Sequence, residues 1–411
     1  AFLAQEAAGV ARKMALPHAP CWRAGAGRGR ALVRGQLLLA GLAAFGRGYP
    51  LLPDFHFEAS DTSHAEHFRL GAAMGSAYQQ AVRERAAGHR ALLEDFLASE
   101  DGIRVYSEFL ETHRRLVPQL LQELEGLAHG SNVSFQTLFT MSLEEEIGYF
   151  AHPHSLRKAD HCSDYMLCTS EHCIDGHNED GNLPDRRFFP AFVRMGGLNF
   201  TALNYAGDLL GGMAAFAFNS AGLAFSLNWV GPRTCTTRGL GRNFVSRLLL
   251  EARSWEEAVA VISLKHAAGH NYQLMDFDHR RIANFEVAHD RYSSREVAEP
   301  FFHANQYQTL NVRGQIVGNS SAHRLARVRE LPVPSSPEEV LRVLGDQHDV
   351  QFPVFHDEGS HRRGELSDWT LATVLFDLDQ RTVALMEGNP ARLQVRRVFS
   401  VPRSSPVHLF V

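Results

Sequence analysis

Four features are missing from this chain of 411 residues, and each absence excludes or disfavours a class of function. No segment approaches the roughly 18–20 consecutive apolar residues that a membrane-spanning helix needs. No Gly-x-Ser-x-Gly motif occurs, which disfavours a serine hydrolase, and no glycine-rich segment continues into the Lys-Ser or Lys-Thr of a phosphate-binding loop. The net charge of −5 lacks a basic excess, so nucleic acid is not an expected partner.

Cysteine is also scarce, and acidic residues are missing near the start of the chain. An odd number of cysteines in a chain this long does not suggest a disulfide framework, which favours a reducing, cytoplasmic compartment. No Asp or Glu occurs from Ala7 to Pro53. This stretch is similar to a targeting segment, so an organelle or secretion is the alternative. We expect residues 1–53 to be a leader outside the catalytic fold. The five cysteines are Cys21, Cys162, Cys168, Cys173 and Cys235.

The remaining sequence has two different patterns of apolar residues, one before residue 162 and one after it. In residues 54–161, apolar residues recur at the spacing of amphipathic helices, which predicts helices over 64–98, 103–127 and 134–146. Residues 162–411 have the pattern of short strands separated by Gly, Asn or Asp turns, interrupted by two pairs of helices. This order predicts an α+β layered domain. The expected strands are 163–168, 173–178, 187–195, 199–205, 212–218, 221–228, 271–277, 281–287, 300–304, 371–377 and 382–387, and the expected helices are 242–252, 255–267, 321–331 and 337–345.

The stretch that begins at Cys162 has the pattern of a β-hairpin. An apolar run follows the thiol, residues 169–172 form a polar turn, and a second extended segment ends in Asn-Glu-Asp. The pattern predicts that Cys162 lies at the mouth of a sheet, although a cysteine alone is more often a small buried hydrophobic residue. A zinc site is the rival interpretation, but its spacing matches no usual zinc motif, so no metal and no other cofactor are expected. The zinc ligands that could be combined are Cys168, His172, Cys173 and His177.

Three ordered motifs carry a resemblance to a known family. Cys162 followed by Asn178-Glu179-Asp180 resembles a Cys-Thr pair that leads, about eighteen residues later, to Asn-Trp-Asp. Phe218-Asn219-Ser220-Ala221-Gly222 resembles a Phe-Asn-Ser-Ala-Gly pattern, and His303-Ala304-Asn305 resembles His-Thr-Asn. Together they resemble the acyl-coenzyme A:isopenicillin-N acyltransferase family of N-terminal-nucleophile (Ntn) hydrolases.

The resemblance implies a fold and a mechanism. The fold would be a four-layer αββα sandwich against which the helical N-terminal part packs. The chain would cut itself between His161 and Cys162, and the two products would remain together as a heterodimer. Cys162 would be the nucleophile and its freed α-amine, with an ordinary pKa of about 7.7–8.0, the base. Asn305 would stabilise the oxyanion, and Asp180 would orient the reacting groups.

Further residues follow from the resemblance with less support from the motifs themselves. Arg324 and Arg327 resemble an arginine pair of the family, although a solvated helical face would explain them equally well. The residues that would contribute to substrate binding are Asp164, Asn178, Asn219 and His356.

The sequence also departs from the family pattern. His161 replaces a Gly, Ser163-Asp164 replaces Thr-Thr, and Pro353 to His356 replaces Ser-Ile-Cys-Arg. Acyl-coenzyme A transfer to a β-lactam nucleus is therefore not expected. The better prediction is a hydrolase of a small-molecule linear amide, such as a β-alanyl-amine or another N-acyl conjugate of a small amine or amino acid. The alternatives are an acyltransferase that uses the same thioester, and a non-catalytic scaffold or binding protein of the same fold.

Overall fold

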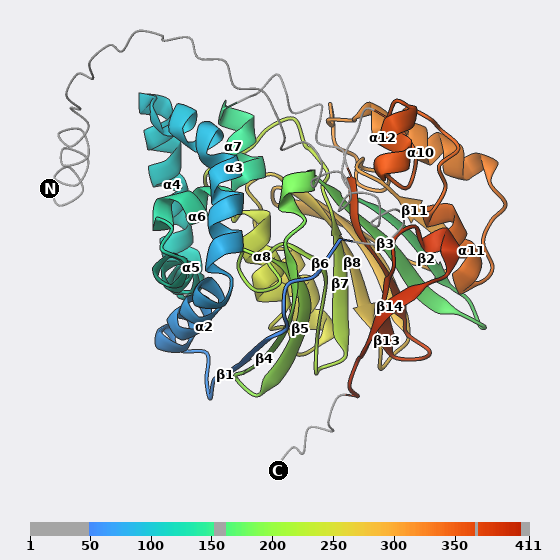
Figure 1. The fold of residues 1–411 in the computed structure, drawn as a ribbon, viewed down its shortest axis with the longest axis horizontal. Coiled ribbons are helices and arrows are strands. Elements are labelled where there is room, and N and C mark those ends of the chain that lie inside the picture. The colour runs from blue at the N-terminus through green and yellow to red at the C-terminus, as the bar shows by residue number, and fades with distance from the viewer. Residues whose placement is uncertain (1–48, 152–161, 366–368, 404–411) are drawn as a thin grey trace, which may run out of the picture. The chain divides into compact units, whose positions relative to one another are not determined.

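The computed structural model describes residues 49–151, 162–365 and 369–403, and these described residues belong to one compact unit. Two β-sheets lie face to face between two layers of helices (Figure 1). From the N-terminal helices on the left of that view, the order is helices, eight-stranded sheet, six-stranded sheet, helices. This arrangement confirms the predicted four-layer α+β sandwich. Within the described part of the chain, no helix combines the length and the apolar character that crossing a membrane requires.

The larger sheet has the strand order β1-β4-β5-β6-β7-β8-β9-β10. Only β1 runs parallel to its neighbour, and every other pair is antiparallel. Side chains alternate between its two faces, so one face packs on helices and the other on the second sheet. Its strands are β1 (Phe55–Glu58), β4 (Phe188–Met195), β5 (Leu198–Tyr205), β6 (Ala214–Asn219), β7 (Leu223–Asn228), β8 (Gly269–Asp276), β9 (Arg281–Ala288) and β10 (Arg291–Glu296).

The smaller sheet has the order β11-β2-β3-β12-β13-β14 and is antiparallel throughout. On β2, Tyr165 and Leu167 face the outer helices, whereas Met166 faces the larger sheet, as the two-residue period of a strand requires. Its strands are β2 (Ser163–Cys168), β3 (Cys173–Gly181), β11 (Phe301–His303), β12 (Trp369–Asp377), β13 (Thr382–Met386) and β14 (Val395–Ser400).

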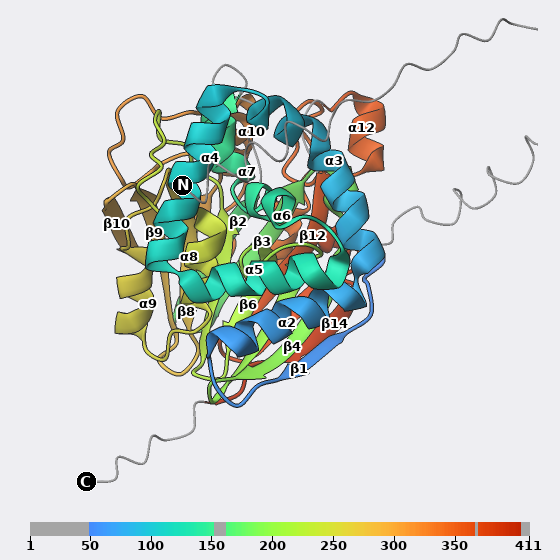
Figure 2. The same ribbon diagram turned by 90° about the vertical axis from the view of Figure 1, so that its left-hand side faces the viewer.

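Helices cover the outer faces of both sheets (Figures 1 and 2). The helices that pack on the eight-stranded sheet are α2 (His64–Ala77), α3 (Gln79–Leu97), α4 (Glu100–Leu116), α5 (Pro118–Ser131), α6 (Phe135–Met141), α7 (Glu144–Ala151), α8 (Arg242–Leu249) and α9 (Trp255–Ile262). On the side of the six-stranded sheet lie α10 (Asn319–Glu330), α11 (Pro337–Leu344) and α12 (Glu358–Arg363).

Two of the expected long helices are each divided in the structure. The helix predicted over 64–98 breaks at Tyr78, whose hydroxyl donates a hydrogen bond to the carbonyl of Pro53 and whose ring stacks on Phe189 at 4.1 Å. Tertiary packing therefore overrides the local helical pattern at this residue. The helix predicted over 103–127 breaks at Val117 because Pro118 begins a new helix, where a missing N–H carries no cost.

Helices α2 and α5 lie against each other at very short range (Figure 2). A Cβ added to Gly71 would stand 1.9 Å from the carbonyl oxygen of Glu123, and one added to Gly126 would stand 2.0 Å from that of Phe68. No side chain fits at those distances, so glycine is required at both positions. The contact aligns His67 of α2 with Glu123 of α5, whose side chains hydrogen bond at 2.9 Å.

Most predicted strands and helices after residue 162 are confirmed to within a few residues. The hairpin at the predicted active site is among them: β2 pairs with β3, and the amide of Thr169 bonds the carbonyl of His172 in the turn. The sequence analysis missed β1, β10, β14 and α12. Strands β10 and β14 are largely exposed edge strands, and polar or charged residues interrupt the apolar pattern that would have marked them.

Candidate active site

Cys162 occupies the position immediately before β2. Its side chain is only 5% exposed, and its backbone adopts a left-handed conformation with φ of 54°. Residues other than glycine rarely adopt this conformation, and such residues persist where their surroundings hold them. Arg324 stabilises this backbone conformation. Its guanidinium donates a hydrogen bond to the carbonyl oxygen of Cys162 at 2.5 Å and another to the hydroxyl of Ser163 at 2.7 Å.

An acid and an imidazole on β3 lie next to the sulfur. The thiol of Cys162 donates to Oε2 of Glu179 at 3.6 Å, and Nε2 of His177 lies 3.1 Å from the same oxygen. The hydroxyl of Tyr205 donates to the other oxygen, Oε1, at 2.6 Å. Glu179 therefore connects the thiol, the imidazole and the phenol. The backbone carbonyl of Asp180 also lies 3.9 Å from the sulfur.

A chain of hydrogen bonds continues from His177 into the space between the sheets. Nδ1 of His177 donates to Oδ1 of Asp164 at 2.9 Å, and the hydroxyl of Ser226 lies 2.7 Å from that oxygen and 3.0 Å from Oδ2 of Asp175. A serine hydroxyl has one proton to donate. One of the two carboxyl groups, that of Asp164 or that of Asp175, must therefore carry a proton if both contacts with Ser226 are hydrogen bonds.

The pKa shifts agree with this arrangement of protons. Burial, reinforced by the nearby Asp164 charge, raises the pKa of Asp175 well above its ordinary value. Burial opposes a charged His177, but the carboxylate of Asp164 outweighs it and raises the imidazole pKa well above its usual range. Burial, then the Glu179 charge, raises the pKa of Cys162 to about 12 although His177 lowers it in part. The thiol is thus protonated near neutral pH in this environment.

Asn305 is connected to Cys162 through Arg324. Arg324 is fully buried and donates to Oδ1 of Asn305 at 2.7 Å, while Nδ2 of Asn305 donates to the carbonyl of Trp229 at 3.0 Å. One guanidinium thus holds the backbone of Cys162 and the amide of Asn305. Of the two interpretations of the arginine pair, the solvated face fits Arg327, which pairs with Asp346 at 2.9 Å and is partly exposed, but not Arg324.

The other predicted site residues divide into two groups. Asp164 contacts His177, and Nε2 of His356 lies 3.5 Å from Oδ2 of Asp180, so both are connected to the Cys162 surroundings. Asn178 instead donates to the carbonyls of Leu344 and Val354, and Asn219 to those of Leu250 and Ala252, which ties helices and loops to the sheets. Substrate binding by these four residues stays a prediction. His161 lies outside the described residues.

The sequence analysis missed His177, Glu179 and Tyr205 as parts of the site. A signal for the first two was available. Asp175, His177 and Glu179 lie at every second position of the sequence, and a strand places such residues on one face. Tyr205 had no comparable signal, because it reaches Glu179 from β5 in the other sheet.

The zinc ligands combined from the sequence are not available as a set. Cys168 and Cys173 face each other at the end of the β2–β3 hairpin and form a disulfide. The sequence analysis expected no disulfide framework and did not foresee this single disulfide, which forms because the hairpin turn brings its two flanking residues into register. Among the described residues, the group that could hold a metal ion is a different one: Cys162, His177 and Glu179.

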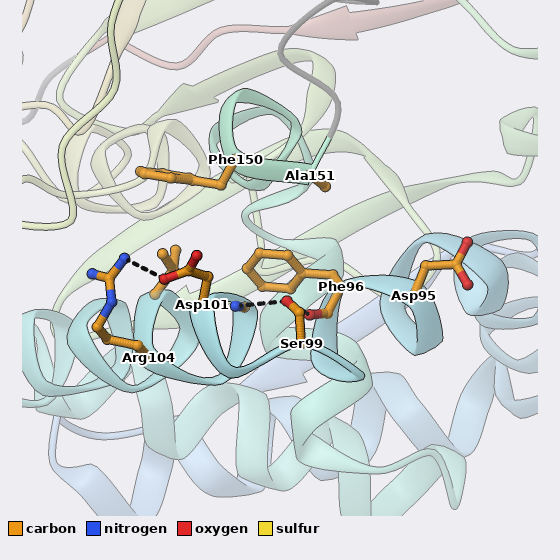
Figure 3. Close-up of a pocket in the computed structure, with 9 residues that line it drawn as sticks. Asp95, Phe96, Ser99, Asp101, Arg104, Phe150 and Ala151 are labelled. Atoms are coloured by element: carbon orange, nitrogen blue, oxygen red, sulfur yellow. Dashed lines mark hydrogen bonds and ion pairs between the residues drawn. The ribbon is translucent and has the colours of Figure 1, made fainter.

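A cavity adjoins the thiol, and its water-accessible volume is about 40 Å³. Five acidic side chains and Arg242 contribute to its lining. A larger hollow of about 270 Å³ lies elsewhere, between the α3–α4 turn and the end of α7 (Figure 3). Phe96 and Phe150 face this hollow, and its Arg104 and Asp101 pair with each other at 3.2 Å on the surface. The hollow next to Cys162 is therefore the candidate active site. Its acidic lining residues are Glu144, Glu145, Glu179, Asp180 and Asp185.

Fold and site together define a four-layer αββα protein with a buried thiol at the start of a central strand. The comparison with known families is more specific. The acyl-coenzyme A:6-aminopenicillanic acid acyl-transferase family matches residues 168–392, more than half of the chain, and the chain belongs to this family. A curated relative, the beta-alanyl-dopamine/carcinine hydrolase of Drosophila melanogaster, is 25% identical over 361 residues, which cover 80% of this chain and 92% of the relative. These relationships indicate an amide hydrolase or acyltransferase of the Ntn type.

Proposed function

We propose that this protein is a self-processing N-terminal-cysteine amidohydrolase that cleaves a linear amide of a small amine or amino acid. The observation that carries the proposal is the position of Cys162, a buried thiol before β2 whose backbone is held by the same guanidinium that holds Asn305. A thiol used only for packing would not need a buried arginine at its carbonyl.

The first step would be a cut between residues 161 and 162. The sulfur adds to the carbonyl carbon of residue 161 and gives up its proton. The amide nitrogen of Cys162 takes up this proton and leaves as a free amine, and a thioester joins the two parts. Water hydrolyses the thioester, which restores the thiol and leaves a free α-amine on Cys162. The products would be chains 1–161 and 162–411, which remain together as a heterodimer because helices α2 to α7 share a core with the eight-stranded sheet.

The new amine supplies what the buried thiol lacks in the uncut chain. Because burial and Glu179 hold the thiol pKa at about 12, a base must take the proton before the sulfur can attack. An α-amine with an ordinary pKa of about 7.7–8.0 can accept this proton and return it to the leaving amine. We assign Asp180 the role of orienting this amine, since its backbone lies beside the sulfur.

Asn305 would stabilise the oxyanion formed when the thiolate attacks the substrate carbonyl. The side-chain oxygen of Asn305, Oδ1, accepts a hydrogen bond from Arg324, which fixes the orientation of the amide. The side-chain nitrogen, Nδ2, is the donor. That nitrogen bonds the carbonyl of Trp229, a residue that lines the Cys162 cavity. The donor is therefore one hydrogen bond away from a residue that lines the proposed substrate space.

The name of the Drosophila relative supports a β-alanyl amide or a similar N-acyl amine as the substrate type. The name of the family supports acyl transfer as the second candidate, in which an acceptor amine replaces water at the thioester. The two candidates share every step up to the thioester. A non-catalytic scaffold is the third, and the closing experiment separates it from both.

The test compares the wild type with Cys162→Ala and, as a control, with Cys235→Ala, which removes the other described free thiol. Denaturing electrophoresis should show two fragments for the wild type and the control, and one intact chain for Cys162→Ala. A screen of N-acyl amines should show release of free amine that only Cys162→Ala abolishes. An uncut wild type that still turns over, or full activity in Cys162→Ala, would contradict the mechanism. An intact chain without any activity would favour the scaffold.

A further inference from the structure

Three potential metal ligands converge at the candidate active site. The sulfur of Cys162, a ring nitrogen of His177 and a carboxylate oxygen of Glu179 all lie within 4.8 Å of one another, and all three residues are buried. Thiolate, imidazole and carboxylate are the three ligand types that zinc uses in proteins. The sequence alone had suggested a different ligand set and no metal.

Two of the three separations between the ligand atoms are close to those around a tetrahedral ion. Zinc ligand distances of about 2.3 Å to sulfur and about 2.0 Å to nitrogen or oxygen, at tetrahedral angles, imply separations of about 3.5 Å between sulfur and oxygen and about 3.3 Å between nitrogen and oxygen. The structure has 3.6 Å between Sγ of Cys162 and Oε2 of Glu179, and 3.1 Å between this oxygen and Nε2 of His177. Both agree to within about 0.2 Å.

The hydrogen-bond partners of His177 and Glu179 are also arranged as they are around metal ions in other proteins. Nδ1 of His177 donates to Asp164 at 2.9 Å, which directs Nε2 toward the sulfur and the carboxylate. Metal-ligating histidines usually donate their other nitrogen to a carboxylate in this way, and loss of that partner typically weakens metal binding about 10–100-fold. Tyr205 occupies Oε1 of Glu179 at 2.6 Å and leaves Oε2 for the ion.

The adjoining cavity supplies an entry route and the fourth position. Cys162 and Glu179 line it together with other acidic residues, and an acidic lining favours the approach of a divalent cation. Three protein ligands and one open position distinguish this arrangement from closed structural zinc sites, which have four protein ligands.

We propose that Cys162, His177 and Glu179 bind Zn²⁺ and that the bound ion inhibits the enzyme. As the ion binds, the thiol of Cys162 loses its proton, and Nε2 of His177 loses the proton that it carries when no metal is bound, because both ligands must be deprotonated. The two protons pass to solvent, and the sulfur is no longer available for attack on a carbonyl. The inhibitory effect rests on the proposed function, whereas the binding itself does not. The ion acts as a removable block and not as a cofactor of the reaction.

Binding is tested without substrate, so its outcome is independent of whether the amidase proposal holds. Calorimetric titration of the full chain with Zn²⁺ after chelator treatment should give one site, and Co²⁺ should give a thiolate-to-metal absorption band in the near ultraviolet. Cys162→Ala should lose the band, and His177→Gln and Glu179→Gln should weaken Zn²⁺ binding at least about 100-fold, since each lacks one of three ligands. Asp164→Asn should weaken it about 10–100-fold.

Cys235→Ala, which removes a thiol outside the trio, should bind Zn²⁺ as the wild type does. Thermal melting of each variant identifies those that fail to fold. Cys162→Ala is a small change at a buried position and is expected to fold, so the loss of the Co²⁺ absorption band can be tested in a folded protein. A wild type that takes up no Zn²⁺ at micromolar concentrations would overturn the proposal, and so would folded variants that keep wild-type affinity. If the amidase proposal holds, Zn²⁺ should also stop amine release at concentrations that match the calorimetric Kd, and a chelator should restore it.

Discussion

The space between the two sheets is filled differently in its two regions. Between β4–β6 and β12–β14 it is apolar and rich in aromatic rings, and Phe216 packs there against both Phe376 and Phe399. Between β2–β3 and β7–β9 it is polar, with Asp164, Asp175 and their partners fully buried. We call these the apolar region and the polar region. Both lie within one sandwich, and single strands contribute to both, as β2 does with Met166 and Asp164.

The difference shows which region holds the fold together and which region serves chemistry. Burial of apolar surface stabilises a fold by about 25 cal/mol per Å², whereas a buried polar group costs free energy unless it is hydrogen bonded. In the polar region this requirement is not met everywhere: the side-chain amide of Asn284 has no hydrogen-bond partner among the described residues. A region that opposes stability in this way is more consistent with a functional role than with a structural one.

The largest effect on stability is expected in the apolar region. Phe216→Ala removes a fully buried ring that packs against three other phenylalanines, and such changes cost about 3–5 kcal/mol. Activity below the melting transition should remain near the wild-type value. Chemical denaturation measures the loss. A loss below about 1 kcal/mol would show that the apolar region does not dominate stability.

The next effect should appear in the polar region and in activity. Asn305→Ala removes the proposed oxyanion donor, and loss of one such donor typically lowers kcat about 10²–10³-fold, or roughly 3–4 kcal/mol. Ser321→Ala is a matched control, because Ser321 contacts the backbone of Asn305 but is not assigned to the chemistry. Steady-state kinetics of amine release compares the two. Equal losses of kcat in both variants would assign Asn305 a structural role.

The third effect accumulates with pH rather than being fixed, and it concerns the pH dependence that the polar region gives to the fold. Since the pKa of Asp175 is raised above the unfolded value of about 3.9, the folded chain keeps a proton that the unfolded chain has lost. Stability should therefore fall as pH rises above about 4, by up to about 1.4 kcal/mol per pH unit, until the folded pKa is passed.

Asp175→Asn removes this dependence and keeps a donor for Ser226. The variant should gain stability relative to the wild type as pH rises, and the two should converge near pH 4. Denaturant unfolding of both proteins at several pH values from about 4 to about 8 measures the difference, and other titrating groups largely cancel in it. Parallel curves would show that Asp175 does not hold a proton in the fold.

The sequence by itself determined most of the strands and helices after residue 162, the β2–β3 hairpin and, through three ordered motifs, the family. These features depend on local period, turn residues and short motifs, which are written along the chain. The same local rules failed at Tyr78, where contacts with Pro53 and Phe189 end a helix that the pattern would continue.

Only the tertiary structure decided the composition of the site. In the sequence, Arg324 is one of several charged residues on a predicted helix, and nothing near it marks it as buried. Its full burial against Cys162 and Asn305 depends on how α10 packs on the six-stranded sheet. Tyr205 reaches Glu179 from the other sheet. Contacts of this kind join residues far apart in the sequence, and no local period encodes them, because they arise from how the layers are stacked.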